Sequence, residues 1–239
     1  MTQKRIALVT GGNKGIGLEI ARQLAQSGLQ VIIGCRDEAR AAAALADLAG
    51  DGLAVTRIPL NLLDHATITA AAAQIQQDHG RLDVLVNNAG IFDFADGTPG
   101  QTSLDAVRKV MEVNFIGTLA VTQAMLPLLR NSDAGRIINL SSSLGSLTLN
   151  GDPASPYYAN QFIGYNASKA ALNMLTVQLH EELKGEGIKV NSVSPGFVKT
   201  DLTGYGTMTP QEGAVLPVQY ALGGDDSGRF VEPDGVTPW

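Results

Sequence analysis

Thr10-Gly-Gly-Asn-Lys-Gly-Ile-Gly17 is the stretch of sequence that decides the fold. An apolar run at residues 6–9 precedes it and predicts a strand, and an Ala- and Leu-containing run at 15–27 follows it and predicts a helix. Gly11, Gly15 and Gly17 permit a tight turn and a close approach of the backbone to a pyrophosphate, which the helix N-terminus attracts. This strand–loop–helix context favours a dinucleotide site over a purely structural turn.

The same alternation of short apolar runs and longer helical stretches continues along the chain. It predicts an α/β fold, a single-domain doubly wound (Rossmann) parallel sheet with helices on both faces, over residues 1–239. Residues 93–100 and 150–156 are expected to be loops, and the chain from Thr203 onward a mobile C-terminal segment. The expected strands are 6–9, 30–34, 54–58, 84–86, 136–140 and 189–193, and the expected helices 15–27, 38–48, 65–79, 102–129 and 165–183.

Composition narrows the class of protein. The chain has 239 residues, 44% of them hydrophobic, and a formal net charge of -6, so nucleic acid is not an expected partner. Its one cysteine, Cys35, excludes an intrachain disulfide and fits a reducing compartment. The apolar run near the N-terminus is too short for a signal peptide or a membrane span. We therefore expect a cytoplasmic protein without membrane contact. His65, His79 and His180 lack metal-ligand spacing, so no metal site is expected.

The end of the second predicted strand bears on cofactor choice. A site for NAD would place an acidic residue there to hold the ribose 2′-hydroxyl, whereas this chain has Cys35 followed by Arg36. Lys14 adds a second cation from the glycine loop, and two cations near one ribose attract a 2′-phosphate. NADPH is therefore predicted over NADH. Asp37 weakens this only slightly if it caps the next helix, and the alternative for Arg36 is a solvated surface charge.

Tyr165 and Lys169 stand four positions apart in Gly164-Tyr-Asn-Ala-Ser-Lys169. On a helix they share one face, where the ammonium would lower the pKa of the phenol from about 10 to roughly 8, suited to proton transfer. The alternative is an ordinary solvated pair.

Further polar residues surround the predicted carboxyl ends of the strands. Residues 136–143 form a strand that ends in three serines, and Asn87-Asn-Ala-Gly90 ends another in a turn of small residues. Asn114 lies inside the helix predicted at 102–129, where it is either a satisfied core amide or part of a polar relay.

With these motifs the chain resembles the short-chain dehydrogenase/reductase family over nearly its whole length. The resemblance rests on the glycine loop, on Asn87-Asn-Ala-Gly90, on Tyr165-x-x-x-Lys169 and on Pro195-Gly-Phe-Val-Lys-Thr200. Gln211-Glu-Gly-Ala214, Gly228-Arg-Phe-Val231 and Trp239 are similar to the carbonyl-reductase branch.

The resemblance implies a function and assigns roles. The expected reaction is hydride transfer between NADPH and the carbonyl of a ketone or aldehyde, with Tyr165 as the proton donor. Lys169 is expected to tune Tyr165 and to bind the nicotinamide ribose, and Ser142, rather than Ser141 or Ser143, to polarise the carbonyl. Asn114 is expected to hold a water between Lys169 and solvent. The cofactor-binding residues implied are Gly11, Asn13, Lys14, Gly15, Ile16, Gly17, Arg36, Asn61, Leu62, Asn88, Ala89, Gly90, Tyr165, Lys169, Pro195, Gly196, Val198 and Thr200.

Two departures from the family pattern stand out. Asn61 takes a place near the adenine where the family often has Asp, and its amide still accepts and donates hydrogen bonds. The spacing from Ser142 to Tyr165 is longer than usual, with a surplus at 147–162 that resembles a shortened form of the insertion of monomeric carbonyl reductases. We expect this insertion near the substrate cleft, residues 203–222 on the substrate side, and a monomer or loose homodimer. Its aromatic residues Tyr157, Tyr158 and Phe162 either line the substrate pocket or pack the loop.

Two other functions compete with carbonyl reduction. One is a 3-oxoacyl or sugar/polyol reductase of the same family. The other is a catalytically silent dinucleotide sensor, which has no need for a complete catalytic set. The chain keeps Asn114, Ser142, Tyr165 and Lys169 together, which favours an enzyme.

Overall fold

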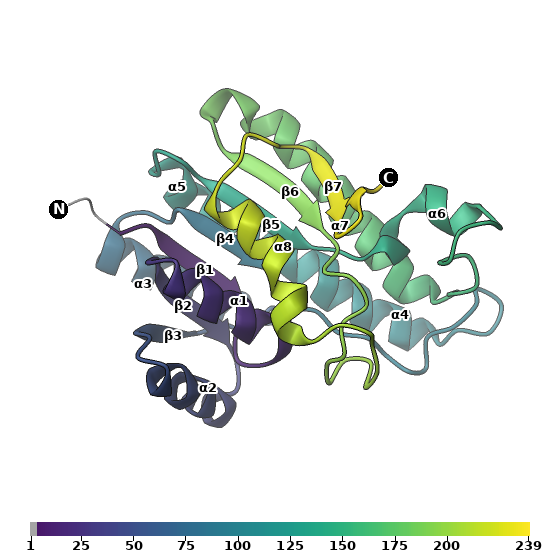
Figure 1. Ribbon diagram of the computed structural model, residues 1–239, viewed down its shortest axis with the longest axis horizontal. Helices are drawn as coiled ribbons and strands as arrows, with labels where there is room; N and C mark the ends of the chain where they lie inside the picture. The colour runs from purple at the N-terminus through teal and green to yellow at the C-terminus, as the bar shows by residue number, and fades with distance from the viewer. Residues whose placement is uncertain (1–3) are drawn as a thin grey trace.

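In the computed structural model, which describes residues 4–239, the strands form one sheet flanked by helices on both faces (Figure 1). The strand order is β3-β2-β1-β4-β5-β6-β7-β8, and every neighbouring pair is parallel except β7 and β8. This architecture confirms the predicted doubly wound α/β fold. The strands are β1 Ile6–Thr10, β2 Gln30–Cys35, β3 Val55–Pro59, β4 Val84–Asn87, β5 Arg136–Leu140, β6 Lys189–Val193, β7 Arg229–Glu232 and β8 Gly235–Val236.

Helices cover the two faces of the sheet in separate groups, which Figure 1 shows in front of and behind the strands. One face is covered by α1 (Gly15–Gln26), α2 (Glu38–Gly50) and α8 (Pro210–Leu222). The other face is covered by α3 (His65–His79), α5 (Thr118–Arg130) and α7 (Ile163–Leu183). The remaining helical elements are α4 Leu104–Met111, η1 Glu112–Gly117, η2 Ser143–Gly145, α6 Leu147–Gly151 and η3 Lys184–Glu186.

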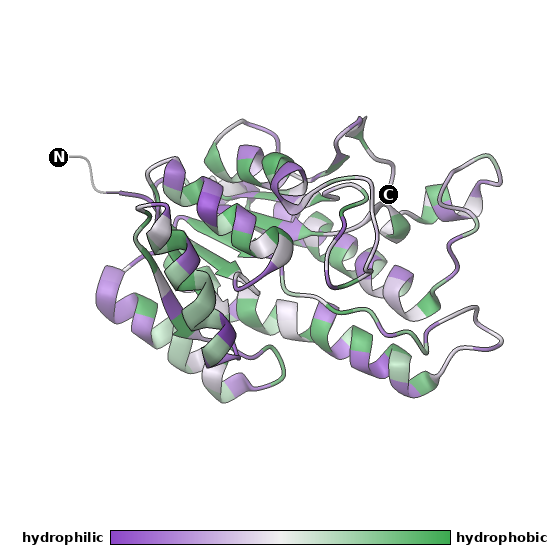
Figure 2. Cartoon of the chain, turned by 60° about the horizontal axis from the view of Figure 1, so that its bottom comes forward, coloured by the Kyte–Doolittle hydropathy of each residue, from purple (hydrophilic) through white to green (hydrophobic). Residues whose placement is uncertain are grey.

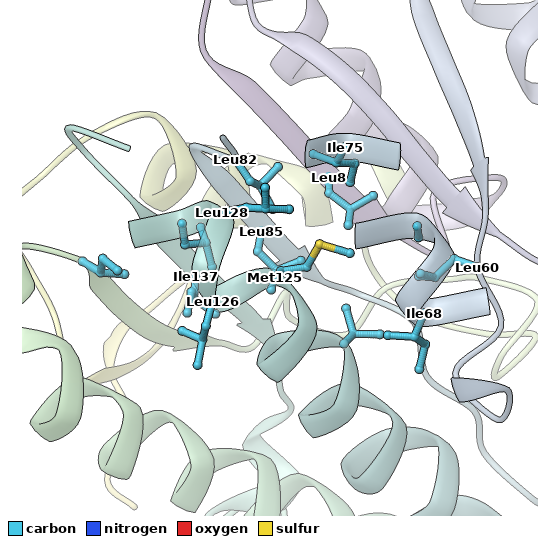
Figure 3. Close-up of a cluster of buried hydrophobic side chains, with 14 of the residues drawn as sticks. Leu8, Leu60, Ile68, Ile75, Leu82, Leu85, Met125, Leu126, Leu128 and Ile137 are labelled. Atoms are coloured by element: carbon cyan, nitrogen blue, oxygen red, sulfur yellow. The ribbon is translucent and has the colours of Figure 1, made fainter. Parts of the chain in front are cut away.

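Successive side chains along each strand point to opposite faces of the sheet, which divides the core into two clusters. Ile6 and Leu8 of β1 pack into the cluster under α3 and α5, whereas Ala7 and Val9 pack into the cluster under α1 and α8. Figure 3 shows the first cluster, in which Leu8 lies near Leu85 and Met125. Figure 2 shows hydrophobic residues along the strands and mixed faces on the outer helices. A sheet buried on both faces explains why its strands are nearly continuous apolar runs.

The strand order reverses beside β1, which pairs with β2 on one side and with β4 on the other. In a doubly wound sheet, this reversal opens a crevice beyond the carboxyl ends of the strands. The glycine loop follows β1 directly, so the fold delivers it to this crevice.

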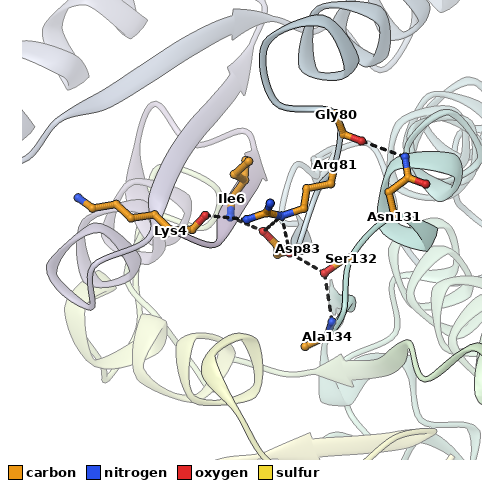
Figure 4. Close-up of polar contacts among 8 residues, drawn as sticks. All are labelled: Lys4, Ile6, Gly80, Arg81, Asp83, Asn131, Ser132 and Ala134. Carbon is orange, nitrogen blue, oxygen red and sulfur yellow. Dashed lines mark hydrogen bonds and ion pairs between the residues drawn. The ribbon is translucent and has the colours of Figure 1, made fainter. Parts of the chain in front are cut away.

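A polar network closes the opposite, amino-terminal edge of the sheet (Figure 4). The buried Asp83 accepts hydrogen bonds from the backbone N–H of Ile6 at 2.7 Å and from the hydroxyl of Ser132 at 2.5 Å. Arg81 pairs with the same carboxylate at 3.2 Å. One carboxylate thereby joins the starts of β1 and β4 to the turn before β5.

The long helix predicted at 102–129 is present but begins two residues later. Ser103 caps it by accepting from the N–H of Ala106, and it runs from Leu104 to Arg130 with a π-helical turn at Glu112–Gly117. Among the described residues this helix alone is long and apolar enough to be considered for a membrane span, but half of its most apolar window is buried in the fold. It is therefore accounted for as a core helix.

The C-terminal part of the chain differs from the expectation of a mobile segment from Thr203. Residues 210–222 form α8, which starts with a capping box between Thr209 and Glu212, and residues 229–236 add β7 and β8 to the sheet. The expectation was wrong because frequent Pro and Gly hid these short elements. Pro210 occupies the first turn of α8, where it has no hydrogen bond to lose.

Candidate active site

A cleft of about 610 Å³ lies beyond the carboxyl ends of the strands and contains most of the predicted site residues. From the predicted set it is lined by Gly11, Asn13, Lys14, Gly15, Ile16, Gly17, Arg36, Asn61, Leu62, Asn88, Ala89, Gly90, Tyr165, Lys169, Pro195 and Thr200. Among the predicted catalytic residues, Asn114 and Ser142 do not line it, and neither do Gly196 and Val198 of the predicted cofactor site. Val198 is buried and bridges to Met208, whose sulfur also fills the space next to Gly196.

The glycine loop has the geometry that a pyrophosphate site needs. Gly11 and Gly15 adopt positive φ values of 64° and 54°, a region that favours glycine. A Cβ at Gly17 would stand 2.3 Å from the side-chain amide of Asn88, which donates to the carbonyl of Thr10 at 2.9 Å. No side chain caps the start of α1, so its first N–H groups remain available to an anion.

Basic residues gather at the end of the cleft beside β2. Arg36 and Arg40 both line it and are exposed, and Asp37 between them caps α2 by accepting from the N–H of Arg40 at 2.9 Å. Lys14 forms an exposed ion pair with Asp201 across the cleft at 3.0 Å. Sequence reasoning missed Arg40. Its spacing of four from Arg36, in the first turn of the helix, was the available signal.

Tyr165 and Lys169 lie on α7 at the other end of the cleft. The ammonium of Lys169 is 5.6 Å from the centre of the Tyr165 ring and donates to the carbonyl of Leu140 at 2.7 Å. Ser142, which follows the end of β5, is near enough to the Tyr165 hydroxyl to lower its pKa. Residues predicted from two separate segments therefore come together.

Protonation of this pair differs from the expectation. Burial raises the pKa of Tyr165 to about 12, and the neighbouring Ser142 hydroxyl acts against the rise. Burial lowers the pKa of Lys169 to about 8. The expected lowering of the Tyr165 pKa by Lys169 was wrong, because desolvation of the phenolate outweighs the attraction of an ammonium that is itself desolvated. Tyr165 is therefore held as a neutral phenol.

The three serines after β5 have different surroundings. Ser141 donates to the side chain of Asn173 at 2.6 Å, and Ser143 donates to Glu232 at 2.5 Å, so both hydroxyls are used within the fold. Ser142 accepts from the N–H of Leu144 at 3.2 Å, and of the three serines it alone acts on the pKa of Tyr165.

Asn114 lies in the π-turn of the long helix and is almost fully buried. Its amide accepts from the N–H of Ile91 at 2.8 Å and donates to the carbonyl of the same residue at 2.9 Å and to Ser168 at 3.1 Å. A Cβ at Gly90 would meet both Asn114 and the Lys169 ammonium, at 3.3 Å and 3.7 Å. Asn114 is thus a satisfied amide that also contacts α7.

An aromatic cluster flanks Tyr165. The Phe92 ring packs edge-on against Tyr165, Phe162 and Phe94, with ring centres 5.6, 5.1 and 5.3 Å away. Phe92 and Phe94 line the cleft, and sequence reasoning missed them because no motif marks them. Of the aromatic residues in the insertion, Phe162 joins this cluster and Tyr157 donates to Glu232 at 3.0 Å, which packs the loop.

Comparison with known proteins identifies the family. A family model described as short chain dehydrogenase matches residues 5–209. The chain belongs to the short-chain dehydrogenase family. Carbonyl reductase (NADPH) 1 from Homo sapiens is 34% identical over 279 residues, covering 98% of each chain. Salutaridine reductase from Papaver bracteatum is 32% identical over 298 residues, covering 97% of this chain and 95% of the relative.

Solved structures agree with the sequence relatives. An NADPH-bound carbonyl reductase from chicken fatty liver superimposes with a TM-score of 0.86 at 33% identity, covering 99% of this chain and 100% of the other. This short-chain dehydrogenase is therefore an oxidoreductase whose relatives include carbonyl reductases.

Proposed function

We propose that this enzyme reduces the carbonyl of a ketone or aldehyde with NADPH, and that Tyr165 donates the proton. The proposal rests on one observation: Tyr165 and buried Lys169 line the cleft that the glycine loop also lines, and Ser142 is near enough to Tyr165 to act on the pKa of its hydroxyl. The named carbonyl reductases among the relatives support the same reaction.

The residues present fit a phosphorylated dinucleotide. The uncapped start of α1 and the positive-φ glycines suit the pyrophosphate, and Asn61 and Leu62 line the region proposed for the adenine. The positive charges of Arg36, Arg40 and Lys14 suit a 2′-phosphate. The acidic residue beside them, Asp37, is used as a helix cap. Pro195 and Thr200 line the cleft on the side proposed for the nicotinamide. A bound NADPH would supply the hydride.

The protein residues then have complementary roles. Ser142 donates a hydrogen bond to the substrate oxygen, and Tyr165 transfers its proton as negative charge develops there. The neutral phenol favoured by burial is the form that reduction requires. Lys169 stabilises the phenolate left behind, and Asn114 is proposed to hold a water on the route by which that proton is replaced.

The walls near Tyr165 favour an apolar substrate. Phe92 packs against Tyr165, and Phe94 and Leu202 also line the cleft, so these side chains offer a sugar or polyol few hydrogen-bonding groups. This favours simple ketones and aldehydes over polyols. We also propose a cytoplasmic enzyme that is monomeric or a loose dimer. The buried free thiol of Cys35 supports the location. The proposed assembly rests on the insertion, which contacts α7 through the hydrogen bond from Asn166 to Asn150 and would cover part of that helix.

A substrate panel tests the proposal. Alkyl and aryl ketones, aldehydes, a 3-oxoacyl thioester and a ketose are each offered with NADPH, and NADPH absorbance is followed. We expect turnover of at least one ketone or aldehyde, with weaker turnover of the ketose and with NADH. Tight NADPH binding without turnover of any compound would contradict a reductase and support a sensor.

A further inference from the structure

A buried carboxylate from a distant loop caps the helix that carries Tyr165. The preceding residue, Phe162, supplies no side-chain cap to α7. Asp96, which lies between β4 and α4, accepts instead from the N–H of Gly164 at 3.0 Å and from the N–H of Tyr165 at 2.8 Å. Only 8% of Asp96 is exposed. A residue 68 positions earlier therefore satisfies the first turn of α7.

The loop around Asp96 is folded onto the same carboxylate. The Oδ1 atom of Asp96 accepts from the hydroxyl of Thr102 and from the N–H of Gly97, both at 2.9 Å. The carbonyl of Gly97 in turn accepts from the N–H of Ile163 at 3.0 Å. The loop and the start of α7 consequently form one hydrogen-bonded unit with Asp96 at its centre.

Gly164 makes this close approach possible. A Cβ at this position would stand 3.0 Å from Asp96 Oδ2 and 3.1 Å from Cα of Val107 on α4. Any larger residue must push the start of α7 away from the loop or from α4. The glycine before Tyr165 thus serves the contact between the catalytic helix and Asp96.

We propose that Asp96 is a positioning residue for the reduction, acting through Tyr165. This inference rests on the proposed role of Tyr165 as proton donor. The hydrogen bond to the backbone of Tyr165 fixes where its side chain starts, and hence how its hydroxyl meets Ser142. The carboxylate also places a negative charge beside the backbone of Tyr165, which we expect to disfavour the phenolate in addition to burial.

Other charges near Tyr165 come from two places. Lys169 lies on the same helix, with its ammonium 5.6 Å from the ring centre. On the loop and α4, Asp93 is paired with Lys109 at 2.7 Å, and Lys109 lines the cleft. Asp96 differs from Asp93 because its carboxylate bonds to α7 itself. Asp93 is therefore a matched control on the same loop.

The test measures kcat, KM and the pH dependence of kcat for Asp96→Asn, with Asp93→Asn as the control. Asparagine retains one acceptor oxygen but loses the bond to the Tyr165 N–H and the negative charge. We expect kcat to fall about tenfold or more, with the KM for NADPH nearly unchanged. The apparent pKa of the proton donor should fall by about one unit. Asp93→Asn should leave both kcat and that pKa unchanged.

A second variant keeps the inference testable if Asp96→Asn folds poorly. Gly164→Ala retains the Asp96 charge but displaces the helix start, so kcat should fall without a shift of the apparent pKa. Wild-type kcat in Gly164→Ala, or a lower melting temperature of Asp96→Asn with wild-type kcat and pH profile, would show a purely structural role. Full activity of Tyr165→Phe would refute the proposed function. An inactive Tyr165→Phe beside a normal Asp96→Asn would refute only this inference.

Discussion

The two edges of the sheet use buried charge in opposite ways. At the amino-terminal edge, Asp83 meets Arg81, Ser132 and the backbone of Ile6, so its charge is paired and hydrogen-bonded (Figure 4). At the carboxyl-terminal edge, Lys169 donates to a carbonyl instead of meeting a carboxylate. Its pKa falls to about 8, and that of Tyr165 rises to about 12.

The difference separates groups that hold the fold from groups that carry out chemistry. Removing one partner of a buried, fully paired charge strongly destabilises the folded state. Buried ionisable groups without a countercharge are costly as they stand, and such perturbed groups in a cleft are typical of functional sites. Each of the following changes is expected to affect one edge and leave the other intact.

Asp83→Ala should have the largest effect on stability. It leaves Arg81 without this carboxylate and removes the acceptor of the Ile6 N–H and the Ser132 hydroxyl. We expect the free energy of unfolding in urea to fall by about 3–5 kcal/mol, with kcat per folded molecule unchanged. The control is Asp105→Ala, which breaks an exposed ion pair with Arg108 and should change the free energy of unfolding little. Equal effects of the two variants would remove the contrast between the edges.

Lys169→Met should stabilise the protein at neutral pH. The folded-state pKa of about 8 lies below the ordinary value of 10.5, so the charged lysine destabilises the folded state below pH 8. Removing it should raise the free energy of unfolding at pH 7 by roughly 3 kcal/mol. This gain should shrink as the pH rises from about 8 to 10.5, where the wild-type lysine is neutral in both states. The exposed Lys184, changed to Met, is the control, and a gain independent of pH would contradict this explanation.

Arg36→Ala should weaken the binding of NADPH but not that of NADH. Arg36 lines the cleft next to Cys35, and one charge-assisted contact with a phosphate is worth roughly 1.5 kcal/mol. The KM for NADPH should therefore rise about tenfold while the KM for NADH changes little. If both constants rise equally, Arg36 does not recognise the 2′-phosphate.

Asp201→Asn should have the smallest effect. It should lower the KM for NADPH, whereas Arg36→Ala raises it. Asp201 pairs with Lys14 in an exposed ion pair, which competes with a phosphate for the same ammonium. Releasing it should lower the KM for NADPH about two- to fivefold, as expected for a surface pair. A higher KM would mean that Asp201 instead holds Lys14 in its binding position.

Much of the fold followed from sequence because most of the predicted strands are buried on both faces. The six predicted strands all exist, and their apolar runs are distinctive. The short β7 and β8 and the Pro-containing α8 lacked such a signal. The π-turn at Asn114 was also missed, because one extra residue in a helical turn leaves no pattern in an apolar helix.

The site was predicted where short motifs fix spacing and missed where distant segments meet. The glycine loop and the Tyr165–Lys169 pair are local, and the structure brings both to one cleft. The cap that Asp96 gives to α7 joins residues far apart in the chain, and the Phe92 cluster depends on loop conformation. The pKa of Tyr165 was misjudged because its burial was not readable from the sequence.

Tyr165→Phe tests the central claim most directly. The variant removes the hydroxyl that meets Ser142 and keeps the ring against Phe92, so the fold and the cofactor site should be unaffected. Reduction of the best ketone or aldehyde is measured in a single turnover, together with the Kd for NADPH by fluorescence. We predict a rate at least about 100-fold lower with an unchanged Kd. A variant that keeps more than about a hundredth of the wild-type rate would contradict the role of Tyr165 as proton donor.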